Sequence, residues 1–117
     1  MKTALTVADR VTLISVLRSV KSEDLNLLLD IRDKTKSFQL DDQEKIKVGY
    51  KENKAIGTAT WDDEEYQVEF ELSKGVVRNY IDRVKELAKE KAITAGLENV
   101  LALYEKLNNL SDEPVKS

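Results

Sequence analysis

Residues 66–72 constrain the fold of this chain more than any other stretch. Apolar side chains alternate there with polar ones: Tyr66, Val68, Phe70 and Leu72 against Gln67, Glu69 and Glu71. Successive side chains of a strand point to opposite faces, so this segment predicts a strand with one apolar and one wet face. A sheet built on such a strand packs helices on one side only, which favours an α+β domain.

Two further strands are predicted just before this one. Residues 48–50 and 55–61 carry β-forming side chains, and the polar runs 51–54 and 62–65 separate the three segments. Short polar connections join antiparallel neighbours. The sequence therefore predicts a three-stranded antiparallel β-meander over about residues 46–72.

Helices are expected before the meander. Thr6 and Asp9 have the spacing of a capping box, and apolar residues at helical intervals then run to about Arg18. Because residues 11–17 are rich in β-branched side chains, a buried strand is the alternative there. Ser22 is the expected N-cap of a second helix that ends near Lys36.

Capping signals also mark the later helices. Asp41 and Glu44 predict one or two helical turns before the meander. Ser73 begins a helix that ends near Lys91, and Thr94 begins the last one. The short connection predicts an antiparallel helix pair packed on one sheet face. Residues 1–112 are expected to form a single α+β domain and residues 113–117 a short flexible tail.

The absence of two residue types limits the chemistry of the chain. It has no cysteine and no histidine in 117 residues, which excludes thiolate catalysis, His-based catalysis and the commonest metal ligands. No catalytic residue, metal site or cofactor is therefore expected. A small carboxylate- or metal-dependent enzyme is the weaker alternative, based on the run 62–65 or on the pair Glu69 and Glu71.

Charge is distributed unevenly along the chain. The net charge is −3, but residues 41–72 hold ten acidic and four basic side chains, a local charge of −6. Such a surface attracts a basic partner. The candidate partner-binding surface combines these acids with aromatic residues favoured in interfaces: Tyr50, Trp61, Asp62, Asp63, Glu69 and Glu71.

A second hypothesis assigns binding to the N-terminal helices. They carry a local excess of positive charge that suits a nucleic-acid-associated regulator, at Arg10, Arg18, Lys21, Arg32, Lys34 and Lys36. The sequence lacks a helix-turn-helix glycine and a set of stacking aromatics, which weighs against this alternative.

Several short motifs together resemble small uncharacterised proteins of bacteriophages and prophages. The motifs are Leu5-Thr6-Val7 with Arg10 and Leu13, Trp61 followed by the strand Tyr66 to Phe70, Val76-Val77, and Leu101 to Lys106. The resemblance implies a phage setting inside a bacterial host and no known reaction. Residues 18–37 depart most from this pattern.

These observations predict a non-enzymatic protein–protein interaction module acting in the bacterial cytoplasm. Charges at Asp9 and Arg10 interrupt the N-terminus before an export signal forms. The uncharged residues 11–17 are far fewer than the roughly 20 that a membrane span needs. The expected partner is a host or phage protein, and an exposed sheet edge offers a route to a homodimer.

Overall fold

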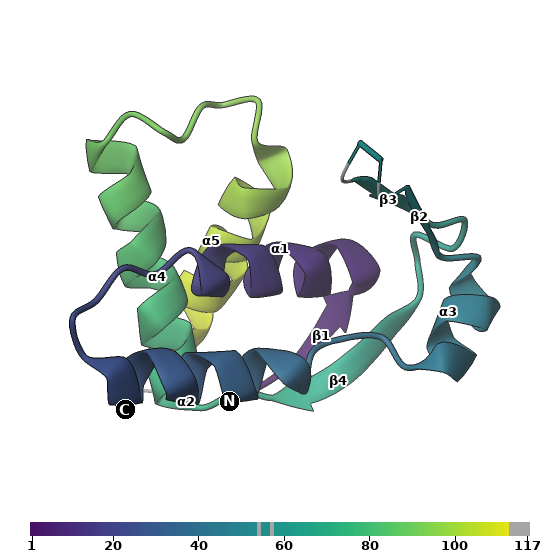
Figure 1. Cartoon of the computed structure of the whole chain (residues 1–117), viewed down its shortest axis with the longest axis horizontal. Coiled ribbons are helices and arrows are strands. Elements are labelled where there is room, and N and C mark those ends of the chain that lie inside the picture. The colour runs from purple at the N-terminus through teal and green to yellow at the C-terminus, as the bar shows by residue number, and fades with distance from the viewer. Residues whose placement is uncertain (54, 57, 113–117) are drawn as a thin grey trace.

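The computed structural model describes residues 1–53, 55–56 and 58–112. This part of the chain forms five helices and four strands, in the order β1 (Lys2–Thr6), α1 (Val7–Arg18), α2 (Leu25–Lys36), α3 (Asp42–Val48), β2 (Lys51–Asn53), β3 (Thr58–Thr60), β4 (Gln67–Glu71), α4 (Lys74–Lys89) and α5 (Glu98–Asp112). The α+β class is confirmed (Figure 1). The predicted tail, residues 113–117, lies outside the described residues.

The predicted three-stranded meander is wrong. The strands form two separate antiparallel pairs, β1 with β4 and β2 with β3. In the first pair Thr3 lies opposite Phe70 and Leu5 opposite Val68. Leu5 is fully buried. The pairing therefore places a core residue of β1 beside Val68, on the apolar face of β4.

The hairpin boundaries also differ from the prediction. Val48 ends α3 rather than starting a strand, because Gly49 takes a left-handed conformation (φ 70°) that terminates the helix. Residues 51–53, predicted as a loop, form β2, and β3 covers only 58–60 of the predicted 55–61. Positions 54 and 57 lie outside the described residues.

The helix starts follow the capping signals. Thr6 and Asp9 form the predicted capping box of α1, and Asp41 and Glu44 form that of α3. Ser73 caps α4 as predicted. The strand alternative for residues 11–17 is wrong, because α1 spans them. Two starts lie later than predicted: Asp24, not Ser22, caps α2, and α5 begins at Glu98, after Thr94.

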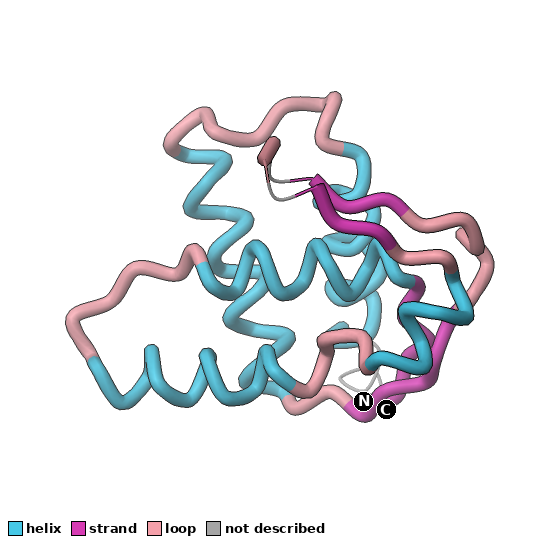
Figure 2. Tube along the Cα trace, turned by 45° about the vertical axis from the view of Figure 1, so that its right-hand side comes forward, coloured by secondary structure: helices cyan, strands magenta, loops and turns pink. Residues whose placement is uncertain are grey.

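The core lies where α1 meets α2, α4 and α5 (Figure 2). The chain runs along α4 and returns along α5 (Figure 1), and the Tyr80 hydroxyl ties the two helices by donating to the Val100 carbonyl at 2.8 Å. Leu5 and Leu72 carry the β1–β4 sheet into the same apolar cluster. The opposite face of β4, with Gln67, Glu69 and Glu71, is exposed as predicted.

The elements α3, β2 and β3 project from this body as a lobe, called the α3 lobe below (Figure 1). Val48 is the buried residue of α3, and β2 is exposed along its length. Among the described residues, no helix is long and apolar enough to cross a membrane.

Candidate functional site: an aromatic groove beside α1

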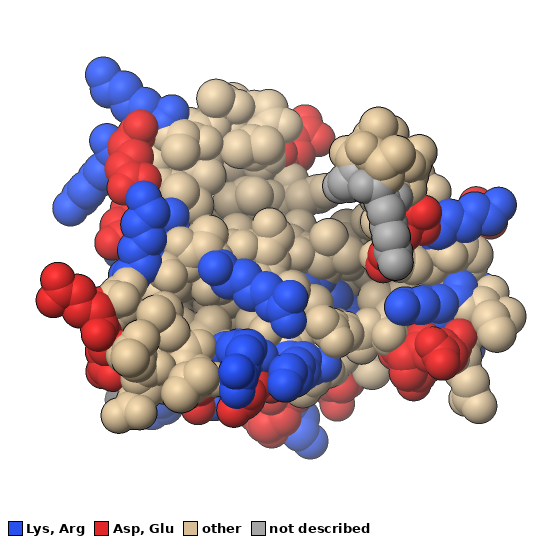
Figure 3. Space-filling view, viewed as in Figure 1, with Lys and Arg blue, Asp and Glu red and all other residues tan. Residues whose placement is uncertain are grey.

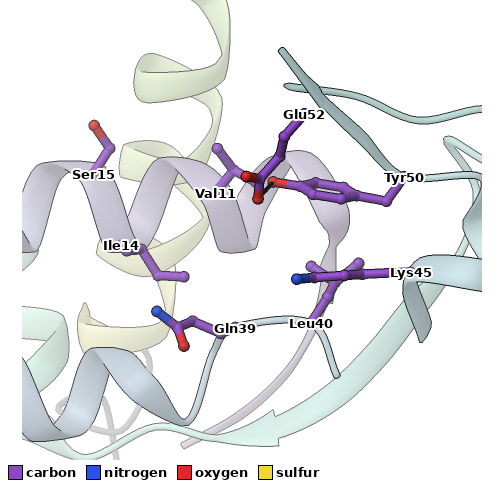
Figure 4. Close-up of a pocket in the computed structure, with 8 residues that line it drawn as sticks. All are labelled: Val11, Ile14, Ser15, Gln39, Leu40, Lys45, Tyr50 and Glu52. Atoms are coloured by element: carbon purple, nitrogen blue, oxygen red, sulfur yellow. Dashed lines mark hydrogen bonds between the residues drawn. The ribbon is translucent and has the colours of Figure 1, made fainter. Parts of the chain in front are cut away.

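A hollow of about 390 Å³ lies between α1 and the α3 lobe, and we call it the aromatic groove. Figure 4 shows the side chains that line it. They come from α1, from the loop before α3, from α3 and from the hairpin: Val11, Ile14, Ser15, Gln39, Leu40, Lys45, Tyr50 and Glu52. The groove thus joins two parts of the fold that are distant in sequence.

Apolar side chains line the α1 side of the groove. Val11 and Ile14 stand three residues apart on α1, so they share one helix face. Both are only half-buried, as is Leu40 from the loop before α3. Leu13 and Leu17 of α1 are in the core, and Ile14 packs against that core while it also lines the hollow. The groove therefore exposes apolar area that the fold does not cover.

Tyr50 and Trp61 form an aromatic pair on the lobe side. Their ring centroids lie 6.4 Å apart with only 12° between the ring planes. The Lys45 ammonium lies 5.7 Å from the Tyr50 ring centroid, within the range of a cation–π contact. The Tyr50 hydroxyl donates to the Glu52 carboxylate at 3.2 Å. Burial and this carboxylate raise the pKa of Tyr50, so its hydroxyl keeps its proton.

The end of α3 brings the two rings together. The Val48 carbonyl accepts hydrogen bonds from the amides of Asp62 and Asp63, at 2.8 and 3.2 Å. Gly49 turns the chain sharply before Tyr50, and a Cβ at Gly49 would lie 2.4 Å from a carboxylate oxygen of Asp62. This close approach fixes Trp61, the residue before Asp62, near Tyr50.

The acidic run 62–65 has a structural role at Asp63. Its carboxylate accepts hydrogen bonds from the amides of Glu65 and Tyr66, each at 3.1 Å, and so closes the turn that leads into β4. No group of three or more acidic side chains within the described residues is arranged to hold a metal ion.

The predicted six-residue surface is divided by the fold. Tyr50, Trp61, Asp62 and Asp63 gather at the end of α3, as described above. Glu69 and Glu71 lie instead on β4, which pairs with β1. The amino group of Met1 donates to the Glu71 carboxylate and lowers its pKa. The two glutamates thus belong to a different surface from the aromatic pair.

Sequence analysis missed the buried network that holds the α3 lobe against the body. Arg10 of α1 is only 2% exposed, and its guanidinium makes two hydrogen bonds to Glu44 of α3, at 2.8 and 3.1 Å. The Tyr66 hydroxyl also donates to Glu44, at 2.9 Å. The hydrogen bonds from Arg10 lower the pKa of Glu44 from 4.5 to about 2. The signal in the sequence was Arg10 itself, a charge on the apolar side of α1.

Four of the six basic side chains predicted to form a nucleic-acid surface on the N-terminal helices have acidic partners. Arg10 is buried, while Lys34 pairs with Asp30 at 3.1 Å and Arg32 with Asp33 at 3.1 Å. Lys36 lies 3.9 Å from Asp33. Figure 3 shows a group of basic side chains side by side at the lower centre of this face, with acidic side chains below them. Arg32 and Lys36 share the carboxylate of Asp33, and Arg18 donates to the neutral Thr35 hydroxyl at 3.2 Å, so these contacts reduce the positive charge offered to a phosphate backbone without removing it.

Comparison of the chain with protein-family models, with curated proteins and with solved structures gave no match. The evidence on function therefore comes from the residues of this chain.

Proposed function

We propose that this protein is a non-enzymatic protein–protein interaction module and that the aromatic groove binds its partner. The observation that carries the proposal is the half-exposed, stacked pair of Tyr50 and Trp61, of which Tyr50 lines a hollow that Val11, Ile14 and Leu40 make partly apolar. Aromatic side chains that enter such hollows supply most of the binding energy in many interfaces. Polar groups at Gln39, Lys45 and Glu52 would form the rim.

A second observation supports the same lobe. Ile46 of α3 is 83% exposed on a short helix with polar neighbours and adds to the apolar surface of the lobe. The α3 lobe therefore presents apolar area that its own fold leaves uncovered.

The setting of this function is part of the proposal. The resemblance to phage proteins favours a host or phage protein as the partner, and the proposal places this interaction in the bacterial cytoplasm. The nucleic-acid alternative loses support because Arg10, Arg32 and Lys34 are engaged by acidic side chains of the chain itself.

The test is capture from a bacterial lysate followed by binding measurements with each purified candidate. A Tyr50→Ser/Trp61→Ser variant should bind the true partner at least about thirtyfold more weakly, because hot-spot truncations cost about 2 kcal/mol or more. Circular dichroism and thermal unfolding check that the variant keeps its fold.

The matched control is Leu25→Ser/Leu29→Ser, which removes two exposed leucines from α2 without touching the groove. It should leave affinity within about twofold of the unchanged protein. Equal binding by the groove variant and the unchanged protein would refute the groove as the site. A protein that retains no partner and stays monomeric would argue against the interaction module itself.

A further inference from the structure

The two outer edges of the β1–β4 sheet differ. The outer edge of β1 is covered by its own chain: Lys106 of α5 donates to the Ala4 carbonyl at 2.6 Å, and the Asp9 carboxylate accepts from the Thr6 amide at 3.1 Å. Lys106 also pairs with Asp9 at 2.9 Å, which holds this cover in place. These contacts leave β4 as the open edge of the sheet.

The pairing with β1 determines which backbone groups of β4 face outward. The Leu72 amide donates to the Met1 carbonyl at 2.7 Å, and the register continues this alternation along the strand. The amides and carbonyls of Val68 and Phe70 therefore face β1, while those of Gln67, Glu69 and Glu71 face away. Within the described part of the chain, these outward groups have no backbone partner. An edge of this kind is a template for another strand.

The apolar face of β4 borders a second hollow, of about 560 Å³. Val68 and Phe70 line it from the strand, and Gln43 and Lys47 line it from α3. A strand added beside β4 would point every second side chain toward this side of the sheet. Most of the residues that line the hollow are polar, Arg10, Asp41 and Glu44 among them, so aliphatic side chains fit next to the strand, where they would extend the surface of Val68 and Phe70.

The opposite face of β4 selects against self-association. An antiparallel pair of β4 strands centred on Glu69 would place the two Glu69 carboxylates side by side, with Glu71 close to Gln67. Like charges in that arrangement repel. A strand with Lys or Arg at these positions would instead pair with both glutamates.

From the open edge, the hollow and the charge pattern we propose that β4 accepts an extended segment of a partner protein in which Lys or Arg alternates with aliphatic residues. Main-chain hydrogen bonds to Gln67, Glu69 and Glu71 would hold the segment, and its basic side chains would contact the Glu69 carboxylate and the 63% exposed Glu71 side chain, which also accepts from the Met1 amino group. This surface is distinct from the aromatic groove, and the inference does not depend on the function proposed for that groove.

The probe is a short fluorescent peptide that alternates Lys and Val, with blocked ends, titrated at low and at physiological salt. Binding should protect the amides of Gln67, Glu69 and Glu71 from hydrogen exchange. A Glu69→Lys/Glu71→Lys variant should bind it at least about tenfold more weakly, because two attractive cross-strand pairs become repulsive. The variant Glu64→Lys/Glu65→Lys makes the same change of charge in the exposed turn before β4, and should change affinity less than about threefold.

Two modified peptides test the strand geometry. In antiparallel addition, the residues opposite Glu69 and Glu71 direct their amides at β4, and these are the basic ones. Methylation of the Lys backbone nitrogens should therefore abolish binding, while methylation of the Val nitrogens should leave it measurable.

Three results would overturn the proposal: no binding at low salt, equal weakening by the two charge variants, or equal binding of the two methylated peptides. Protection of the β4 edge in the peptide-free protein through dimerisation would also overturn it. The Tyr50→Ser/Trp61→Ser variant should bind the peptide as the unchanged protein does, so failure here is separate from failure of the groove hypothesis.

Discussion

Replacement of Arg10 by Met tests whether the α3 lobe depends on one buried charge. Met has a similar length and an apolar stem, so it fills much of the same space without the guanidinium. The change removes the hydrogen bonds from Arg10 to Glu44 and to the carbonyls of Phe38 and Gln39. It also removes the cation from its position 5.1 Å from the centroid of the Phe70 ring.

The structure fixes the size of the expected effect. Loss of one member of a buried ion pair costs about 3–5 kcal/mol, because the other charge is left unpaired. Glu44 is 18% exposed, so water reaches its carboxylate and the cost lies at the lower end of that range. We expect Arg10→Met to lower the free energy of unfolding by about 3 kcal/mol. For a domain of this size that corresponds to a fall in Tm of about 12 °C.

The assays are urea denaturation and amide hydrogen exchange. Denaturation gives the global loss, and exchange should show the largest loss of protection in α3, since Glu44 ties that helix to the body. A double-mutant cycle with Glu44→Gln isolates the interaction energy between Arg10 and Glu44 from the effect of each substitution alone. We expect this coupling energy to be about 2 kcal/mol.

The reasoning is refuted if Arg10→Met lowers stability by less than about 1 kcal/mol. It is also refuted if the coupling with Glu44 is near zero, because the cost would then come from packing or from the carbonyls. The matched control is Arg78→Met, which removes an exposed arginine of α4 and should change stability by less than about 0.5 kcal/mol.

Three further predictions concern pH, a turn and a helix contact. The pKa of Glu44 is about 2 in the fold and 4.5 ordinarily, so its stabilising contribution is complete above pH 4.5 and is lost as the pH falls toward 2. Urea titrations over this range should show a loss of about 2–3 kcal/mol that Glu44→Gln removes. Gly49→Ala should cost about 1–2 kcal/mol in thermal unfolding, because of the left-handed backbone and the contact with Asp62, and Asp62→Ala in the same chain should restore part of it. Tyr80→Phe should cost about 1 kcal/mol in urea denaturation, because the Val100 carbonyl loses its donor. If Tyr80→Phe unfolds at the same urea concentration as the unchanged protein, this hydrogen bond does not stabilise the fold.

Local signals in the sequence were sufficient for most of the helices. Helix capping involves residues within four positions of one another, so it can be predicted without knowing the tertiary contacts. This holds for the capping boxes that begin at Thr6 and Asp41 and for the N-cap Ser73. The alternation of residues 66–72 likewise predicted which face of β4 is wet. These features depend on short-range physics.

Strand pairing could not be predicted in the same way. In the stretch Lys2–Thr6, Leu5 is the one strongly apolar residue. No pattern in this stretch predicts that it pairs with residues 67–71. Neighbouring segments were assigned to β4 instead, because short connections are the commonest. Packing in the core determines this strand pairing, because Leu5 of β1 belongs to the apolar cluster that the helices form.

The candidate site was predicted in part for the same reason. Tyr50 and Trp61 were chosen as aromatic residues of one segment, and the turn at Gly49 brings them together. Val11 and Ile14 line the other side of the groove, and Ile14 also packs against the core. Helical periodicity does not show which residues of an apolar stripe border a hollow. Their role depends on where the α3 lobe docks.

The pairing of β1 with β4 has a consequence for how the chain folds. Lys2 and Glu71 are partners although they stand 69 positions apart, so β1 has no paired strand during synthesis until β4 has been made. Helices such as α1 can form before β4 is synthesised. Leu5, which is buried in the complete fold, stays exposed to water until β4 pairs with β1. Closure of so long a loop carries a large entropic cost and slows folding. Synthesis of β4 therefore sets the earliest moment at which the native core can assemble.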